Sequence, residues 1–259
     1  MKKHLIWAAA SAALLASCAK EETQTFTPAA TDLPQASITF VAEENADFTR
    51  AFFDNTTTTE AWEQSLSSLT VFCFEEGALV MRRNFTSAEL SSRRSTFALP
   101  RSTAGKSIEF YALANAAVDE NITTKTALLA LTEETPGSYN GTFANVSSKA
   151  LRSGGFLMSG TATKSIGAAG TTTEVAITLR RDVAKVAVQA SLSPAFADKY
   201  PGTVRITSVK LSRSAMQTPY FGGTPKTGAM TFTHTQTPGE TSGRFNALFY
   251  CFENAALAS

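Results

Sequence analysis

The segment ASITFVA, residues 36–42, places Ile38 and Phe40 on one side of an extended chain and Ser37 and Thr39 on the other. Successive side chains of a β-strand point to opposite faces. This period of two therefore predicts a strand with one buried and one solvated face. Most of the remaining chain is built from short segments of the same kind.

Turn residues separate these segments at regular spacing, and few stretches have the period of a helix. Glu76-Gly77 predicts the turn of a hairpin over residues 69–85. We expect a helical turn at Ala61–Ser65 and a short helix within residues 121–134. Further strands are expected within residues 95–100, 107–115, 154–160, 172–181, 182–192, 203–212 and 244–253.

Many short strands with scarce helix predict an all-β fold of antiparallel sandwiches. A break near Arg180–Asp182 divides the strands into two sets, and the chain is long enough for two domains. No period of about 20 to 50 residues repeats, which argues against a solenoid or a propeller.

The N-terminus reads as an export signal. Lys2 and Lys3 precede the apolar run Leu5–Leu15, which is shorter than the roughly 20 residues of a membrane-spanning helix. The sequence Leu15-Ala-Ser-Cys18 matches a bacterial lipobox. We therefore expect cleavage between Ser17 and Cys18, with acyl chains such as palmitate on Cys18. Two or more such chains would anchor the protein firmly to a membrane. An ordinary signal peptide with a chance cysteine is the alternative.

Catalytic and cofactor-binding residues are scarce. A formal charge of +1 argues against nucleic-acid binding. His234 is the only histidine after the leader and lies in a threonine-rich stretch, where we expect it to be solvated. The segment AGKS, residues 104–107, lacks the first glycine of a phosphate-binding loop, since Pro100 occupies that position. We expect no enzyme activity, no metal and no cofactor.

Two further features have a simple structural interpretation and a functional alternative. Cys73 and Cys251 lie in apolar strand-like segments, where two buried free thiols or a disulfide are both open. Glu133 and Glu134 could form an acid–base pair, but adjacent side chains point apart. We expect both carboxylates to be solvated.

Taken in order, several segments resemble the fimbrillins of the Bacteroidales, the subunits of the type V pilus. They are the lipobox, ASITFVA ahead of TRAF, the LTVFCF hairpin, FYALANA, FLMSG, LRRDVAKVAV and FYCFEN. The charged residues Lys20-Glu-Glu22 likewise resemble the signal that sends Bacteroidetes lipoproteins to the outer leaflet.

The resemblance implies two tandem transthyretin-like β-sandwich domains and assembly by strand exchange. In shaft subunits an arginine-specific protease cuts after the first strand, which leaves, and a strand of a neighbouring subunit replaces it. Here the removable strand would be Ala36–Ala42, and the cleaved bond would be Arg50-Ala51. Other fimbrial subunits, the protease and the outer membrane are the implied partners. Anchor subunits keep their lipid and are not cut, which leaves an uncleaved Arg50 as the alternative.

The implied organisation is a signal peptide at 1–17, a lipidated tether with the removable strand at 18–50, and domains at 51–180 and 181–259. Because the chain ends soon after FYCFEN, at Ser259, we expect the second domain to be incomplete. A monomeric surface lipoprotein that binds a glycan or host ligand through Trp62, Tyr220 or Phe221 is the alternative function.

Overall fold

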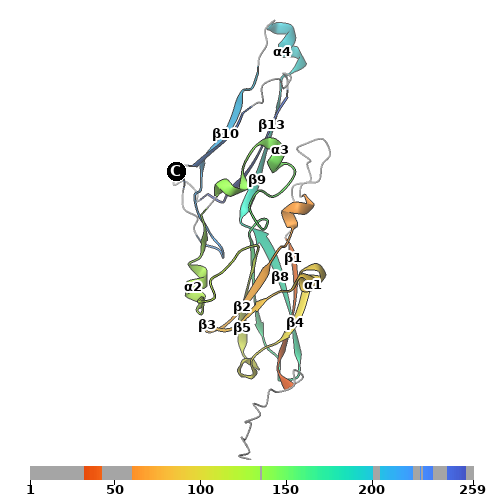
Figure 1. Ribbon diagram of the computed structural model, residues 1–259, viewed down its shortest axis with the longest axis vertical. Coiled ribbons are helices and arrows are strands. Elements are labelled where there is room, and N and C mark those ends of the chain that lie inside the picture. Colours follow the sequence, from red (N-terminus) through yellow and green to blue (C-terminus); the bar gives the residue numbers. More distant parts are fainter. Residues whose placement is uncertain are drawn as a thin grey trace, which may run out of the picture.

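A computed structural model describes residues 32–42, 60–134, 136–200, 205–223, 228, 230–235 and 244–254 of the chain. These residues form an elongated, mostly β protein with short helices (Figure 1). The elements, in chain order, are β1 (Gln35–Ala42), the 3-10 helix η2 (Ala61–Gln64), β2 (Leu69–Glu75), β3 (Ala78–Asn84), α1 (Ser87–Ser92), β4 (Arg94–Ala98), η3 (Arg101–Thr103), β5 (Ser107–Ala114), α2 (Lys125–Leu129), β6 (Thr132–Glu133), η4 (Pro136–Tyr139), α3 (Phe143–Val146), β7 (Met158–Ser165), β8 (Thr172–Arg181), β9 (Val183–Ser191), α4 (Pro194–Lys199), β10 (Ser208–Ser214), β11 (Thr218–Pro219), β12 (Met230–Thr235) and β13 (Arg244–Phe252).

Seven strands form one sheet, in the order β3-β2-β5-β7-β8-β1-β4. We call this part, in the lower half of Figure 1, the lower sandwich. β7 and β8 are paired only at Met158↔Arg181 and Ser159↔Arg180, and beyond these residues they separate into two layers. A Cβ atom on Gly160 would lie 2.3 Å from the carbonyl oxygen of Thr178. Only glycine allows the two backbones to approach so closely where the layers part.

The core of the lower sandwich lies between the two layers. Alternate residues of β1, β2, β5 and β8 point inward, as a period of two requires. β2 is buried on both faces, because Phe72 and Phe74 point away from this core. Leu128 of α2 covers them, so the helix expected within residues 121–134 is present and serves to bury the outer face of β2.

The hairpin predicted over residues 69–85 is present as β2 and β3. Its two turn residues, Glu76 and Gly77, both have positive φ angles, at 49° and 87°. A turn of this kind matches the right-handed twist of the strands that it joins. The helical turn expected at Ala61–Ser65 is also present, as η2.

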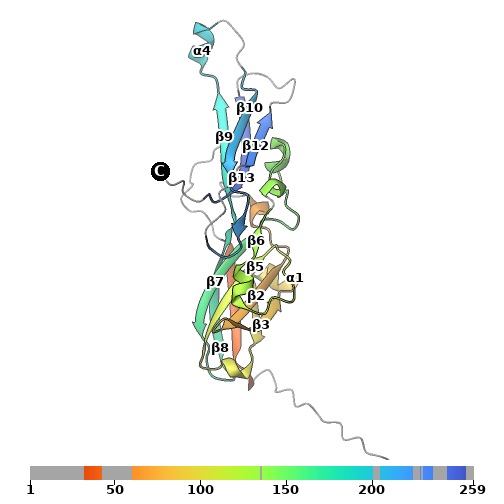
Figure 2. The same cartoon turned by 90° about the vertical axis from the view of Figure 1, so that its left-hand side faces the viewer.

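β9, β10, β12 and β13 form the upper strands, as two antiparallel pairs, β9 with β13 and β10 with β12. Figure 2 shows them continuing the long axis beyond the lower sandwich, with α4 at the far end. Only Asp182 separates β8 from β9, so the two strand sets meet where the sequence predicts a break. The upper strands have a core of their own, which holds Phe232, Phe245 and Phe249.

Two sequence-based expectations about the strands are wrong. β1 pairs with β8 in parallel, whereas the sequence predicts antiparallel sheets throughout. No hairpin joins these two strands, so local connection does not fix their relative direction. His234 is not solvated: it is 5% exposed in β12, with Nε2 2.6 Å from the carbonyl oxygen of Leu248. Phe232 and His234 are two residues apart in the strand, so both side chains point to the same face and into the core.

Candidate functional site

The candidate site is the groove between β4 and β8 that β1 occupies. β1 pairs in parallel with β8 over its whole length, from Gln35↔Thr172 to Ala42↔Leu179. On its other side it pairs antiparallel with β4. β1 is therefore an inner strand, although it lies close to the start of the sequence.

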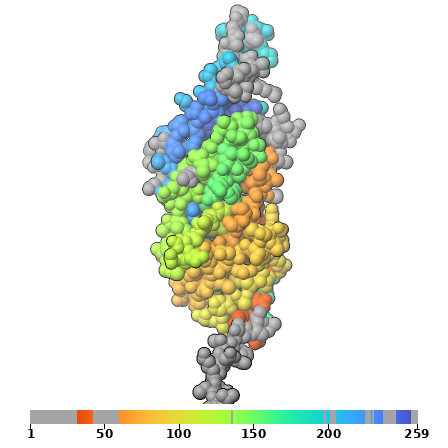
Figure 3. All heavy atoms as spheres, in the orientation of Figure 1, coloured from red at the N-terminus to blue at the C-terminus, as the bar shows by residue number. Residues whose placement is uncertain are grey.

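The inward face of β1 fills the core of the lower sandwich. Ile38 and Phe40 are 0% and 1% exposed, and the smaller Ala36 and Ala42 are also buried. The ring of Phe40 meets that of Phe85 edge-to-face, with centroids 5.6 Å apart. On the face shown in Figure 3, β1 is visible only as a small red patch near the lower end. The predicted burial of this face is confirmed.

The outward face of β1 is crossed by a charged pair. Arg94 of β4 donates from Nε and Nη2 to Ser37 Oγ, at 3.1 and 2.8 Å. The same Nη2 lies 3.0 Å from Glu174 Oε1 on β8. Sequence reasoning assigns Ser37 to the outer face but misses Arg94 and Glu174, because strand pairing brings them together from distant segments.

This geometry defines what the groove can bind. Without β1, the facing edges of β4 and β8 would carry unpaired backbone N–H and C=O groups above an apolar floor. β4 pairs with no other strand among the described residues. An extended peptide with alternating apolar side chains supplies both the missing hydrogen bonds and the missing core residues, as in β-strand addition.

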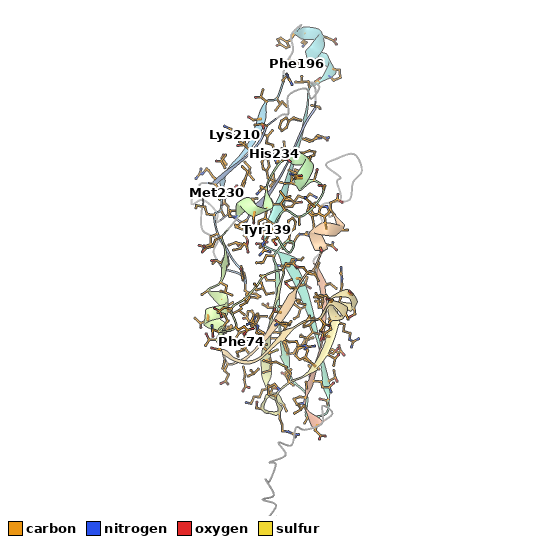
Figure 4. The ribbon with its side chains drawn as sticks, viewed as in Figure 1. Phe74, Tyr139, Phe196, Lys210, Met230 and His234 are labelled. Carbon is orange, nitrogen blue, oxygen red and sulfur yellow. The ribbon has the colours of Figure 1, made fainter. Side chains whose placement is uncertain are left out.

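A second cluster joins the lower sandwich to the upper strands. Tyr139, Phe156 and Tyr250 pack together here, and Tyr139 lies midway along the molecule in Figure 4. The Tyr139 hydroxyl donates to Asp182, at 3.0 Å from Oδ2. Burial raises the pKa of Asp182 to about 7. Glu63 completes the junction through an ion pair with Lys185, 2.8 Å long.

Glu133 is buried, so the expectation of two solvated carboxylates is wrong for this residue. The guanidinium of Arg152 binds it through Nε and Nη2, at 3.1 and 3.0 Å. Arg152 also donates from Nη1 to the carbonyl oxygen of Asn115, at 2.6 Å. The pair therefore anchors a loop to the sheet, a structural role.

Other candidate residues also have structural surroundings. Trp62 packs against Phe156 and Tyr250, and Phe221 packs against Tyr111, so these aromatic side chains are used inside the protein. Cys73 and Cys251 are free thiols. Within the described ranges, no three His, Cys, Asp or Glu side chains gather into a possible metal site. In the same part of the chain, no helix has the length and apolar character needed to cross a bilayer.

The predicted processing residues lie outside the described residues. These are Ser17 and Cys18 in the leader, and Arg50 and Ala51 between β1 and η2. The described chain stops at Ala42 and resumes at Glu60, so the predicted cleavage site lies in the segment that follows β1.

Comparison with known proteins identifies the class. A family model described as fimbrillin-A associated anchor proteins Mfa1 and Mfa2 matches residues 34–255, and the chain belongs to this family. The resemblance to Bacteroidales fimbrillins is thereby confirmed. No curated protein sequence matches significantly.

Three solved structures share the fold at low sequence identity. A candidate cell adhesion protein from Parabacteroides distasonis is 16% identical with a TM-score of 0.57, covering 88% of this chain and 73% of that one. The fimbrilin FimA from Porphyromonas gingivalis is 14% identical with a TM-score of 0.53, covering 88% and 68%. The tip fimbrial protein Mfa3 from the same species, truncated at its C-terminus, is 16% identical with a TM-score of 0.50, covering 76% and 66%.

Proposed function

We propose that this chain is a structural subunit of a cell-surface fimbria that functions in adhesion and assembles by strand exchange. The observation that carries the proposal is β1. It is an inner strand of the sheet, its inward side chains are buried, and it is followed by a segment containing Arg50. Membership of a fimbrial family supports the same function.

The assembly would begin with export as a lipoprotein. Cys18 would carry the lipid that holds the chain on the outer membrane after cleavage at Ser17–Cys18. β1 would complete the lower sandwich during export, since without it the sheet would present an open groove prone to aggregation. The proposed organisation is two tandem transthyretin-like domains, at 51–180 and 181–259, preceded by the tether and strand at 18–50.

Proteolysis would then make the groove available. We expect Arg50, which is followed by the small residue Ala51, to be accessible to an arginine-specific protease. After cleavage at Arg50-Ala51, only noncovalent contacts would hold β1, and a strand of a neighbouring fimbrial subunit could replace it. The structure of β1 suits this step, because among the described strands it pairs only with β4 and β8.

An uncleaved anchor subunit is the second candidate, and the family description, which names anchor proteins, favours it. In that case Arg50-Ala51 stays intact, β1 stays in place, and the lipid on Cys18 holds the base of the fimbria. The two candidates share the fold and the family, and they differ in the fate of one strand.

The experiment that separates them is the intact mass of the protein taken from the surface of the cells that make it. A chain starting at Ala51 without lipid is the result expected for strand exchange. A chain starting at acylated Cys18 would instead mean that β1 stays in place, as expected for an anchor subunit or a monomeric lipoprotein. A mature chain with neither start would contradict both.

Variants sharpen the same measurement. Arg50→Ala should block the cut while leaving the fold intact, because the retained β1 completes the sheet. Arg101→Ala is the matched control, since Arg101 is an exposed arginine elsewhere in the chain. Cys18→Ala should abolish membrane retention. Continued laddering of Arg50→Ala into oligomers would count against the strand-exchange mechanism.

A further inference from the structure

The charged pair on the outer face of β1 spans the groove from one wall to the other. Arg94 belongs to β4 and Glu174 to β8, and the two strands flank β1 on opposite sides. Arg94 Nη2 lies between its two acceptors, 2.8 Å from Ser37 Oγ and 3.0 Å from Glu174 Oε1. We name Arg94 and Glu174 the clasp.

Ser37 shows that the clasp covers the strand. It lies on the outward face of β1, yet it is 0% exposed, whereas Val41 on the same face is 53% exposed. The register places Ser37 opposite Glu174 on β8 and opposite Thr96 on β4. The Ser37 side chain is therefore covered by the Arg94 guanidinium, although the Arg94 and Glu174 side chains are themselves 54% and 64% exposed.

We propose that the clasp selects which strand can occupy the groove, by accepting only a small, neutral, hydrogen-bonding side chain at position 37. This inference rests on the proposed strand exchange and identifies the chemistry of the incoming strand. Both clasp residues lie on the walls of the groove, so they would stay with the receiving subunit after β1 leaves. The selected residue arrives with the donor.

The chemistry of the clasp excludes most other residues. An acidic side chain at position 37 could pair with Arg94 but would lie against Glu174, and a basic one would be repelled by Arg94. Valine, which has the shape of threonine but no hydroxyl, would leave the guanidinium without its acceptor at this position. Serine and threonine meet both requirements of the clasp, an oxygen that accepts a hydrogen bond from Arg94 and the absence of charge.

The inward face adds a size pattern to this requirement. The side chains are small at Ala36, large at Ile38 and Phe40, and small again at Ala42, and all four are buried. A slip of one residue would carry Ile38 under the clasp and the hydroxyl into the core. The partner is therefore an extended segment of another fimbrial subunit, with a hydroxyl between a small and a large apolar residue. The clasp fixes its register.

The test uses the full chain, with a specific protease site placed within residues 43–59 and cut after purification. β1 is then held only by noncovalent contacts, and a fluorescent peptide of residues 34–42 competes for the groove. Exchange is followed by anisotropy, and the protein is isolated to confirm that the peptide is incorporated. The Ser37→Thr peptide should enter like the parent. Val41→Thr is the matched control, because Val41 is exposed.

Changes under the clasp should weaken entry. We expect the Ser37→Val peptide to bind roughly tenfold more weakly, the lower end of what a lost hydrogen bond to a charged group costs. The Ser37→Asp peptide should be weakened less, by up to about fivefold, through repulsion from the partly exposed Glu174 carboxylate. In a Glu174→Gln chain, the same Ser37→Asp peptide should recover or exceed the affinity of the parent, because only Arg94 then faces it. A purely steric role for position 37 would not give this rescue.

The outcomes separate the two proposals. Failure of every peptide, including the parent, to enter the cut chain would overturn strand exchange and the clasp together. If the Ser37→Asp and Ser37→Val peptides enter the cut chain as tightly as the parent peptide, the clasp alone is overturned. Weak binding of the Ser37→Asp peptide to both the parent chain and the Glu174→Gln chain would also overturn the clasp. Glu174 would then not be the residue that excludes an acidic side chain at position 37.

Discussion

Replacement of Phe40 by alanine removes the largest side chain that β1 places in the core of the lower sandwich. Phe40 is 1% exposed and makes an edge-to-face contact with Phe85. The change deletes the ring and leaves the backbone pairing of β1 in place. It therefore tests whether the inward face of β1 supplies stability in solution.

The expected cost can be estimated from burial. Phenylalanine-to-alanine changes in cores cost about 3–5 kcal/mol, which includes the cavity that remains. Loss of the aromatic pair contributes about 0.5–1.5 kcal/mol, which places the cost above the lower end of that range. We therefore expect Phe40→Ala to lower the free energy of unfolding of the lower sandwich by about 4 kcal/mol.

Urea unfolding followed by circular dichroism measures this loss. With an m value of about 3 kcal/mol/M, the midpoint should fall by roughly 1.3 M. Val41→Ala is the matched control, because Val41 is the next residue of the same strand and is 53% exposed. It should change the free energy by less than about 1 kcal/mol. Equal midpoints for the two variants would refute the conclusion that β1 is part of the core.

Three further predictions concern the buried polar groups. Arg152→Ala should destabilise the protein by about 3–5 kcal/mol in urea unfolding, because it leaves the Glu133 carboxylate buried without its partner; the same loss in an Arg152→Ala, Glu133→Gln double variant would contradict this reason. Asp182 has a pKa of about 7 in the folded protein and an ordinary value of 3.8, so the folded state holds a proton that the unfolded chain has lost between these values. The free energy of unfolding should therefore fall by about 2–4 kcal/mol as pH rises through this window. Asp182→Asn, which keeps an acceptor for Tyr139, should remove the fall. Thermal unfolding at pH 4 and pH 8 measures the change, and an equal decline in both proteins would contradict the prediction. Burial raises the pKa of the Cys73 thiol to about 12, so this thiol should react with a disulfide reagent only when the protein unfolds, and fast reaction in native buffer would show that β2 is not buried.

The sequence predicts the elements of this fold better than their partners. The period of two in residues 36–42 locates β1, and Glu76-Gly77 locates the first hairpin, because both signals are local. The parallel pairing of β1 with β8 is not local: the two strands lie more than a hundred residues apart in the sequence. Their direction follows from how the whole sandwich closes.

Two errors had different origins. The burial of His234 could have been predicted, since Phe232 and His234 alternate with threonines over residues 230–235 in the pattern of a half-buried strand. Composition obscured that pattern. The burial of Glu133 could not be predicted from the sequence. Its partner Arg152 lies 19 residues away and is brought to it by a loop with no distinctive motif.

The clasp illustrates the same limit for the candidate site. Ser37 is assigned to the correct face by the alternation of its strand. Arg94 and Glu174, however, are ordinary charged residues of two other segments. Nothing in either segment singles them out until β4 and β8 are known to flank β1. Residues that recognise a strand in a groove come from the walls, and the walls are defined by topology.

The separation of the cores gives a physical reason why β1 could be exchanged without loss of the rest of the fold. All the buried apolar side chains of β1 belong to the cluster inside the lower sandwich, and none belongs to the junction around Tyr139 and Tyr250. The junction is instead held by residues of η2, η4, β9 and β13, including the Glu63–Lys185 ion pair. Emptying the groove would free β4 and open one core, while the contacts that connect the lower sandwich to the upper strands would remain. Under the proposed strand exchange, a subunit built in this way would keep the alignment of its two halves while the occupant of its groove changes, as a rigid fibre would require of each repeating unit.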